Sequence, residues 1–232
     1  MIDFHTAHTS NGQRVAIVLE ECALPYRVHA VDIGAGEQFT PEFLAISPNN
    51  KIPAIVDHAP ADGEAPISVF ESGAILLYLA NKTRQFLPVD VREHTRVNEW
   101  LFWQVGGLGP MTGQYGHFNV YAPEAVPYAI ERYTREVQRL LGVLDKQLNG
   151  RAFITGEDYT IADMACYPWI NPYIKAPLDL EPFANLRRWH AAIAARPATV
   201  RAYAHAATVN PQAGKPLSEE ERRILFGQGA PR

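Results

Sequence analysis

The stretch SPNNKIPAIVDH, from Ser47 to His58, places two prolines around a short polar turn and follows the second proline with an apolar run. This second proline, Pro53, stands directly before a predicted strand, where it removes a backbone hydrogen-bond donor. Proline in a sheet is confined to edges, first positions and bulges, and such a turn can leave a backbone edge open to a ligand. The alternative is an ordinary loop that leads into a strand.

The composition is that of an ordinary soluble globular protein. The 232 residues are 47% hydrophobic and carry a formal net charge of −4, without a run of lysines or arginines. This balance gives no electrostatic footprint for nucleic acid or an anionic membrane, so we expect small-molecule partners. The sequence has no secretory-signal pattern and no stretch long enough to cross a bilayer, which favours a cytoplasmic location.

The two cysteines, Cys22 and Cys166, are far apart and form no CxxC pair, so the sequence indicates neither a disulfide framework nor a zinc site. Cys22 falls on the apolar face of the first predicted helix. Cys166 lies in an apolar helix that follows a capping box formed by Thr160 and Asp163. We expect both thiols to be buried and inert, so any redox chemistry has to use a sulfur from another molecule, and no metal is expected.

The first 81 residues alternate between strand and helix patterns. Strands are predicted at Ile2–Thr6, Tyr26–Ile33, Ala54–Asp57 and Ile67–Phe70, and helices at 11–24, Pro41–Ile46 and Ser72–Asn81. This βαβαββα order predicts one small mixed sheet covered by helices.

The strand pattern stops after Asn81. Helical periodicity follows over the segments 91–118, 123–149, 160–176, 183–195 and 197–207. The predicted organisation is an α/β domain (1–81), a linker (82–90), an all-helical domain (91–209) and a loosely ordered C-terminal tail (210–232).

This arrangement resembles the cytosolic glutathione transferase superfamily over nearly the whole chain. The resemblance rests on NKIPAIVD at 50–57, FESGAILLYLA at 70–80 and YTIADMACYPW at 159–169. AHTSNG at 7–12 and WLFWQVGGLGPM at 100–111 look like the nu-class disulfide-bond oxidoreductases, although Ala7 departs from that class. The resemblance implies a thioredoxin-like first domain, a cis peptide bond before Pro53, and glutathione, reduced or oxidised, as the bound thiol.

The chemistry of glutathione then suggests partners for its γ-glutamyl and cysteinyl parts. The γ-glutamyl carboxylate suits the N–H groups and hydroxyl at Ser72, where a helix begins, and the ammonium suits Glu71. Ile52, held extended by Pro53, can offer its N–H and C=O to the cysteinyl residue as an added strand does. The alternative for Glu71 and Ser72 is a cap that only starts the helix.

Gln38 and Lys51 remain for the glycyl carboxylate. Gln38 would act as a hydrogen-bond donor and Lys51 as a point charge. A lysine in a polar turn is also typical of solvated surface, so this alternative stays open for Lys51.

The thiol is expected near the start of the first helix, where the sequence has no Tyr or Cys. The Thr9 hydroxyl and the Asn11 amide or backbone N–H could donate hydrogen bonds to a glutathione thiolate and lower its pKa. Ser10 is an alternative donor, and His5 and His8 are alternative bases. Thr9 and Asn11 could also be only a helix cap and a turn.

In the helical part, the run WQVGGLGPMTGQYGHFNVY (103–121) places glycines and a proline among aromatic residues. This pattern predicts a broken helix and a second-substrate cleft, with packed core as the alternative. The candidate cleft residues are Trp103, Tyr115, His117 and Phe118.

Arg132, in AIERYTRE, matches the position from which nu-class proteins reach across a dimer to the second glutathione. Spacing alone would make it a solvated arginine on a helix face. The resemblance therefore implies a homodimeric, glutathione-dependent disulfide reductase without a catalytic protein cysteine. Two alternatives are a transferase that conjugates glutathione to electrophiles and a non-catalytic glutathione-binding or sensing protein.

Overall fold

The computed structural model describes residues 1–170, 178–209 and 217–227. The chain divides into two compact units, one formed by Met1–Thr83 with Val200–Arg232 and the other by Arg84–Thr199. The sequence-based division differs from these units at residues 200–209, which it assigns to the helical domain and the structure groups with the first unit. Part of the expected helix (171–176) and part of the expected tail (210–216 and 228–232) lie outside the described residues.

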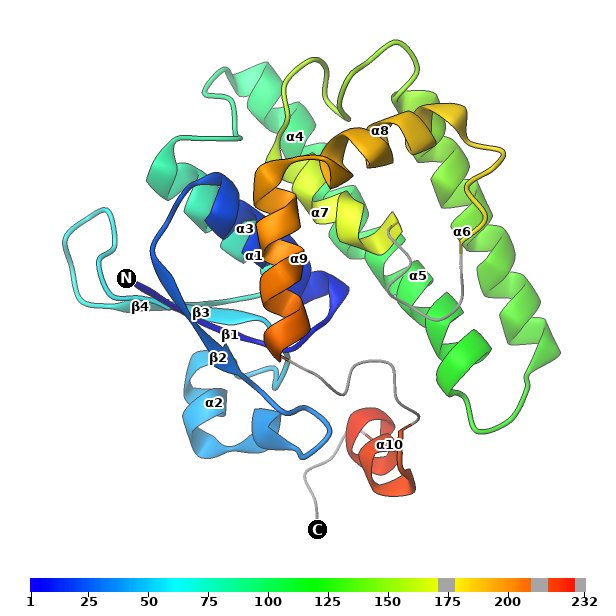
Figure 1. Ribbon diagram of the computed structural model, residues 1–232, viewed down its shortest axis with the longest axis horizontal. Coiled ribbons are helices and arrows are strands. Elements are labelled where there is room, and N and C mark those ends of the chain that lie inside the picture. The colour runs from blue at the N-terminus through cyan, green and yellow to red at the C-terminus, as the bar shows by residue number, and fades with distance from the viewer. Residues whose placement is uncertain (171–177, 210–216, 228–232) are drawn as a thin grey trace. The chain divides into compact units, whose positions relative to one another are not determined.

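The first unit is built on a four-stranded sheet in the order β2-β1-β3-β4. The strands are β1 (Ile2–Thr6), β2 (Tyr26–Ala30), β3 (Ala54–Asp57) and β4 (Ile67–Phe70). β1 pairs in parallel with β2 and antiparallel with β3, which pairs antiparallel with β4 (Figure 1). The predicted mixed sheet is confirmed, with β2 ending three residues earlier than expected.

Helices cover the sheet on both faces. The side chains of β1 accordingly alternate between buried and half-buried. Ile2 and Phe4, each 2% exposed, face the core that includes α1 (Ser10–Glu21) and α3 (Ser72–Thr83). On the opposite face, the His5 ring lies 6.4 Å from the ring of Phe43 in α2 (Pro41–Ile46). A short 3₁₀ helix, η1 (Glu37–Phe39), precedes α2.

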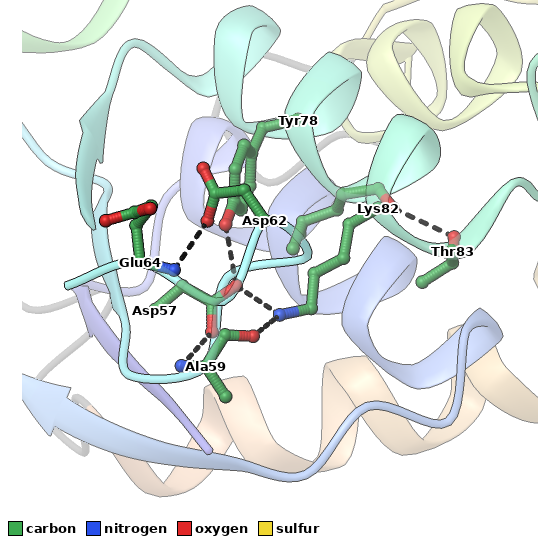
Figure 2. Close-up of polar contacts among 8 residues, drawn as sticks. Asp57, Ala59, Asp62, Glu64, Tyr78, Lys82 and Thr83 are labelled. Atoms are coloured by element: carbon green, nitrogen blue, oxygen red, sulfur yellow. Dashed lines mark hydrogen bonds and ion pairs between the residues drawn. The ribbon is translucent and has the colours of Figure 1, made fainter. Parts of the chain in front are cut away.

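A fully buried carboxylate joins β3 to α3 (Figure 2). Asp57 accepts hydrogen bonds from the Tyr78 hydroxyl at 2.7 Å and the Ala59 N–H at 3.0 Å, and pairs with Lys82 Nζ. Burial raises the pKa of Asp57, but these partners together outweigh it and hold the pKa below its usual value. The network fixes the end of β3 against the last turns of α3, and thereby fixes the direction of that helix over the sheet.

The second unit is helical. Its elements are α4 (Val91–Trp103), the π-helix η2 (Gln104–Leu108), α5 (Gly109–Gly116), the π-helix η3 (His117–Tyr121), α6 (Pro127–Gln147), α7 (Ile161–Ile170) and α8 (Ala184–Ala194). α9 (Pro197–Val209) begins in this unit and continues into the first, which also contains α10 (Glu219–Phe226). The prediction of a loosely ordered tail was wrong for α10.

The glycine run after Trp103 does not break the helix, contrary to the prediction. The chain passes from α4 to α5 through π-helical turns, a local rearrangement that keeps the helix going. A Cβ on Gly109 or Gly113 would lie 3.5 or 3.7 Å from ring atoms of Trp169. At these distances a methyl group would only touch the Trp169 indole, whereas at Gly109 it would also lie 2.8 Å from Gln104 Nε2, so the close approach at Gly109 is to Gln104.

Half of the predicted capping box at the start of α7 is present, because Asp163 reaches back and accepts from the Thr160 N–H at 3.0 Å; the Thr160 hydroxyl donates to the same carboxylate at 3.1 Å. The same carboxylate accepts from the Ile154 N–H at 2.9 Å and from the Trp189 indole N–H at 2.8 Å. Burial raises the pKa of Asp163 to about 6, against the lowering effect of these donors. Asp163 thus joins α7 to α8 as well as capping α7.

Candidate functional site

The register of the sheet gathers the predicted glutathione-binding residues of the first unit at one end. His5 on β1 is paired with Ala54 on β3, and Ala54 with Phe70 on β4. The end of β1, the start of β3 and the end of β4 are therefore neighbours. The loops that carry the predicted site residues therefore begin or finish at this end of the sheet.

Two helices begin at this same end, because β1 and β4 run in the same direction and lead into α1 and α3. The first backbone bond of α3 runs from the Ile75 N–H to Glu71 O at 2.9 Å. In the described part of the chain, the N–H groups of Gly73 and Ala74 have no partner. Unpaired N–H groups and the helix dipoles favour an anion here.

Glu71 occupies a backbone conformation that is rare for its residue type. Its φ is +67°, in the left-handed region that non-glycine residues seldom adopt. The residue turns the chain from β4 into α3 and is itself exposed, whereas Ser72 is only 6% exposed. Left-handed residues of this kind cluster at ligand-binding positions, so the turn supports a functional role for Glu71.

Ile52 presents a free stretch of backbone beside these helix starts. The Ile52–Pro53 peptide bond is cis, as the resemblance implied. Among the described residues, neither the N–H nor the C=O of Ile52 has a hydrogen-bond partner. The preceding carbonyl, of Lys51, accepts from the Ser47 hydroxyl at 2.8 Å. The free groups of Ile52 can pair with an extended peptide as a further strand would.

Thr9 and Asn11 shape the first turn of α1. The Thr9 hydroxyl oxygen is the N-cap and accepts from the Gly12 N–H at 3.2 Å, which leaves its hydrogen able to donate. Asn11 Oδ1 accepts from Arg14 Nη2, and Arg14 is only 3% exposed. The guanidinium can only donate, so it fixes the amide oxygen on its own side and directs the amide NH₂ away from it.

Sequence reasoning missed Arg14. The spacing of three residues from Asn11 within one helical turn was a signal for this contact. Gly12 was missed as well. A Cβ there would lie 2.7 Å from the Ala7 carbonyl oxygen and would collide with the Thr6 hydroxyl, so only glycine lets α1 start this close to β1.

Gln38 is 6% exposed and lies in η1. Its Nε2 donates to the Ile33 carbonyl at 3.1 Å, and its Oε1 is buried without a partner in the described part of the chain. A carboxylate can only accept, so a ligand carboxylate would use the second N–H of Nε2. The Lys51 side chain is exposed, as expected for a point charge at a rim or for solvated surface.

The alternative groups fit structural roles. His5 stacks on His29 with ring centroids 4.6 Å apart, and burial with His29 nearby lowers the pKa of His5. Burial also lowers the pKa of His8, which keeps both rings neutral near pH 7. Ser10 is 7% exposed within α1.

Both cysteines are buried thiols outside any disulfide, as predicted. Cys22 caps the far end of α1, and burial raises the pKa of its thiol despite a contact with the Thr83 hydroxyl. Cys166 is completely buried in α7.

Arg132 and the candidate cleft residues belong to the second unit. The Arg132 side chain is 54% exposed, and its Nη1 lies 3.8 Å from a Glu136 carboxylate oxygen. The Trp103 and Trp100 rings pack edge-on with centroids 5.0 Å apart, and the Phe118 ring stacks on Tyr133 at 5.5 Å. These rings pack on residues of their own unit, as the core alternative expected, and the cleft stays a prediction.

The described residues hold neither a metal site nor a membrane-spanning helix. None of these residues forms a group of three or more His, Cys, Asp or Glu side chains that could hold a metal ion. No helix in the described segments is long and apolar enough to cross a membrane.

Comparisons with known proteins agree with this geometry. The family model for the glutathione S-transferase N-terminal domain matches residues 9–82, and the one for the C-terminal domain matches residues 110–197. The disulfide-bond oxidoreductase YfcG of Escherichia coli is 56% identical over 202 residues, covering 87% of this chain and 94% of the relative.

Two solved structures share the fold and carry ligands. A glutathione transferase family member from Pseudomonas fluorescens, with two glutathione bound, has a TM-score of 0.84 and 46% identity, and the match covers 87% of this chain and 91% of the other. A glutathione transferase from Pseudomonas putida, with one glutathione disulfide bound per subunit, has a TM-score of 0.81 and 39% identity, with coverage of 87% and 90%.

Proposed function

Because the chain belongs to the glutathione S-transferase family, we propose that it reduces small or mixed disulfides with glutathione as the thiol donor. One observation carries the proposal. The unpaired backbone of Ile52 lies at the sheet end where α1 and α3 begin, and both cysteines are buried elsewhere. Such a site can bind and activate a peptide thiol but cannot supply a thiol of its own. The 56% identity to a disulfide-bond oxidoreductase supports the same activity.

In this proposal each part of glutathione meets a matching group. The γ-glutamyl carboxylate lies at the start of α3, with Ser72 and the free N–H groups that follow it, and the ammonium pairs with Glu71. The N–H and C=O of Ile52, next to Pro53, hold the cysteinyl residue as a short added strand.

The glycyl carboxylate and the sulfur lie beside other segments. Gln38 donates to the carboxylate and Lys51 contributes charge. The Thr9 hydroxyl and the Asn11 amide donate to the sulfur and favour the thiolate over the thiol, because donors aimed at a developing negative charge lower its energy.

The reaction needs two glutathione molecules per disulfide. The thiolate of the bound glutathione attacks one sulfur of the disulfide, forming a mixed disulfide while the other substrate sulfur leaves as a thiolate. A second glutathione thiolate attacks the glutathione sulfur of the mixed disulfide, which releases the second substrate thiol and forms oxidised glutathione. The two glutathione sulfurs supply both electrons, so no metal or other redox group is needed.

We further propose that the protein is a homodimer in which Arg132 reaches the second glutathione of the neighbouring subunit. Within the described residues, the exposed guanidinium makes only a long 3.8 Å contact with Glu136, which leaves its donors available. A cytoplasmic location suits the proposal, because glutathione keeps thiols reduced there and both cysteines of this chain are thiols outside any disulfide.

The test compares the purified protein on bis(hydroxyethyl) disulfide and on a chloronitrobenzene, each with glutathione. Disulfide turnover that exceeds conjugation supports the proposal. Dominant conjugation would assign the protein as a transferase, and tight glutathione binding without either turnover would assign it as a sensor.

A variant without cysteines completes the test. The Cys22→Ala, Cys166→Ala double variant should keep its disulfide turnover, because neither thiol takes part. A folded double variant that has lost turnover would contradict the proposed chemistry.

A further inference from the structure

The C-terminal helix α10 is a defined part of the first unit. It begins with a reciprocal capping box, in which the Ser218 hydroxyl accepts from the Glu221 N–H at 3.2 Å and the Ser218 N–H donates to the Glu221 carboxylate at 2.6 Å. Ile224 is 5% exposed, so the helix buries an apolar side chain. A capped helix with a buried anchor keeps its first turn in place.

The first turn of α10 lies against the loop that leads to Gln38. A Cβ on Gly34 would lie 3.2 Å from Glu221 Oε1 and 3.3 Å from Glu221 Cγ. The Asp32 carboxylate accepts from the N–H groups of Gly34 and Ala35 at 3.0 and 3.1 Å, and these bonds hold the loop in place beside Glu221. Glu221 therefore touches the loop at its glycine.

The residue next to this contact holds Gln38. The Ile33 carbonyl, adjacent to Gly34, accepts from Gln38 Nε2 at 3.1 Å. This bond fixes the orientation of the buried Gln38 amide, and so the position of its nitrogen. Only the nitrogen of the amide can donate to a carboxylate. The chain of contacts thus runs from Glu221 to Gly34, through the peptide bond to Ile33, and from its carbonyl to Gln38.

From this geometry we propose that Glu221 of α10 is a positioning residue for the glycyl-carboxylate end of the glutathione site. It acts through the loop on the orientation of the Gln38 amide and so contributes to selectivity for the complete tripeptide. The inference rests on the proposed function, in which Gln38 serves the glycyl carboxylate.

The experiment measures affinity by calorimetry for glutathione and for γ-glutamylcysteine, which lacks the glycyl residue. The wild type should bind glutathione more tightly. Glu221→Ala should reduce this preference about fivefold, a typical size for coupling through one packed contact, while the affinity for γ-glutamylcysteine stays within about twofold. General unfolding would weaken both ligands alike, so the ratio separates positioning from stability.

Glu220→Ala is the matched control. Glu220 lies on the same helix, is exposed and pairs with Arg223 of the same helix, so its loss removes an equal charge without touching the loop. The control should keep the wild-type preference. An equal loss in Glu220→Ala would overturn the inference, because the effect would then come from charge and not from the contact.

A second variant approaches the contact from the loop. Gly34→Ala adds a methyl group within 3.3 Å of the Glu221 side chain and should also reduce the preference. In the Gly34→Ala, Glu221→Ala double variant the crowding is gone, so the loss should be less than the sum of the two single losses. Strictly additive losses would overturn the inference.

The remaining outcomes separate the two proposals. A wild type that prefers glutathione, together with variants that keep the full preference, overturns the inference and leaves the proposed function intact. A wild type that binds both ligands equally overturns the glycyl-carboxylate site and the inference with it.

Discussion

In the proposed site, a buried cation orients the neutral side chain of Asn11. Arg14, 3% exposed, donates to the amide oxygen of Asn11 and fixes the orientation of the amide. The amide nitrogen then faces away from Arg14, so donation to the proposed thiolate would need little further ordering of the amide. Asn11 is in this respect a better-defined donor than Thr9, whose hydroxyl oxygen already accepts from the Gly12 N–H.

Asn11→Ala should slow the turnover of a disulfide by raising its activation free energy by about 3 kcal/mol, the usual cost of one lost donor to a developing anion. Glutathione binding should weaken much less, because the amide favours the thiolate and not the whole tripeptide. Steady-state kinetics across a pH series should show the apparent pKa of the bound thiol rising.

Asn11→Asp is the informative control for this prediction. The aspartate keeps the acceptor for Arg14 but has no donor, so turnover should fall as it does in the alanine variant. Wild-type turnover in both variants would move the role to Thr9, Ser10 or a backbone N–H.

The elements are held in place by buried polar groups that bind across two or more of them. Asp57 joins β3 to α3, and Asp163 joins α7 to α8 (Figure 2 for the first). Each carboxylate is fully buried and has at least three donors. A buried charge without such partners would be costly, so each network tolerates the loss of a partner poorly.

Asp57→Asn should lower the free energy of unfolding by about 3 kcal/mol at neutral pH, because it leaves the Lys82 ammonium without its buried counter-charge. The folded-state pKa of Asp57 is below its unfolded value, so its stabilisation is present above about pH 4 and is lost as the pH falls further.

Denaturant unfolding at several pH values checks both parts of this prediction. The gap between wild type and variant should narrow as the pH falls below about 4. Asp62→Asn is the control, since Asp62 is exposed, accepts from the Glu64 N–H at 3.1 Å and makes no hydrogen bond to Asp57. A constant gap across the pH range would contradict the assigned pKa direction.

Gly109→Ala tests the junction between η2 and α5. The added Cβ would lie 2.8 Å from Gln104 Nε2 and 3.5 Å from the Trp169 ring, so we expect a loss of about 2 kcal/mol in unfolding free energy, typical of overpacking. Gly106→Ala, where no atom lies within 4 Å, should instead be neutral or more stable by up to about 1 kcal/mol. Thermal unfolding distinguishes the two variants, and equal effects would count against the crowding of Gly109 by Gln104.

At the scale of the whole molecule, Arg132 tests the proposed dimer. If it serves the neighbouring subunit, Arg132→Ala should weaken oxidised glutathione by about 1–3 kcal/mol and leave reduced glutathione nearly unchanged, because only the disulfide carries the second tripeptide. Both ligands are titrated at a concentration where the wild type is dimeric.

Arg135→Ala provides the control on the same helix. Its side chain is 75% exposed and pairs with Glu131. This variant should bind both ligands as the wild type does. Equal weakening of the two ligands by Arg132→Ala, or none, would leave Arg132 as a surface residue.

Local sequence determined most elements of the α/β part of this protein. Strand alternation, helix caps and punctuation by proline and glycine act over a few residues, so β1, β3, β4 and α2 have their predicted bounds. The same local signals identified Pro53, the helix start at Ser72 and the capping box at Asp163. The predicted site residues of the first unit follow from such signals and from the family resemblance, and their roles remain to be tested.

Only the tertiary structure decided how these pieces meet. Strand register sets the Ile52 backbone beside the starts of α1 and α3, and packing sets Trp169 over Gly109, Trp189 on Asp163 and Glu221 against Gly34. Each contact joins residues far apart in the chain, and its energy depends on shape and on partners that no local period encodes. The periodicity of the sequence specifies which faces are buried, whereas the matching of those faces specifies what each buried group touches.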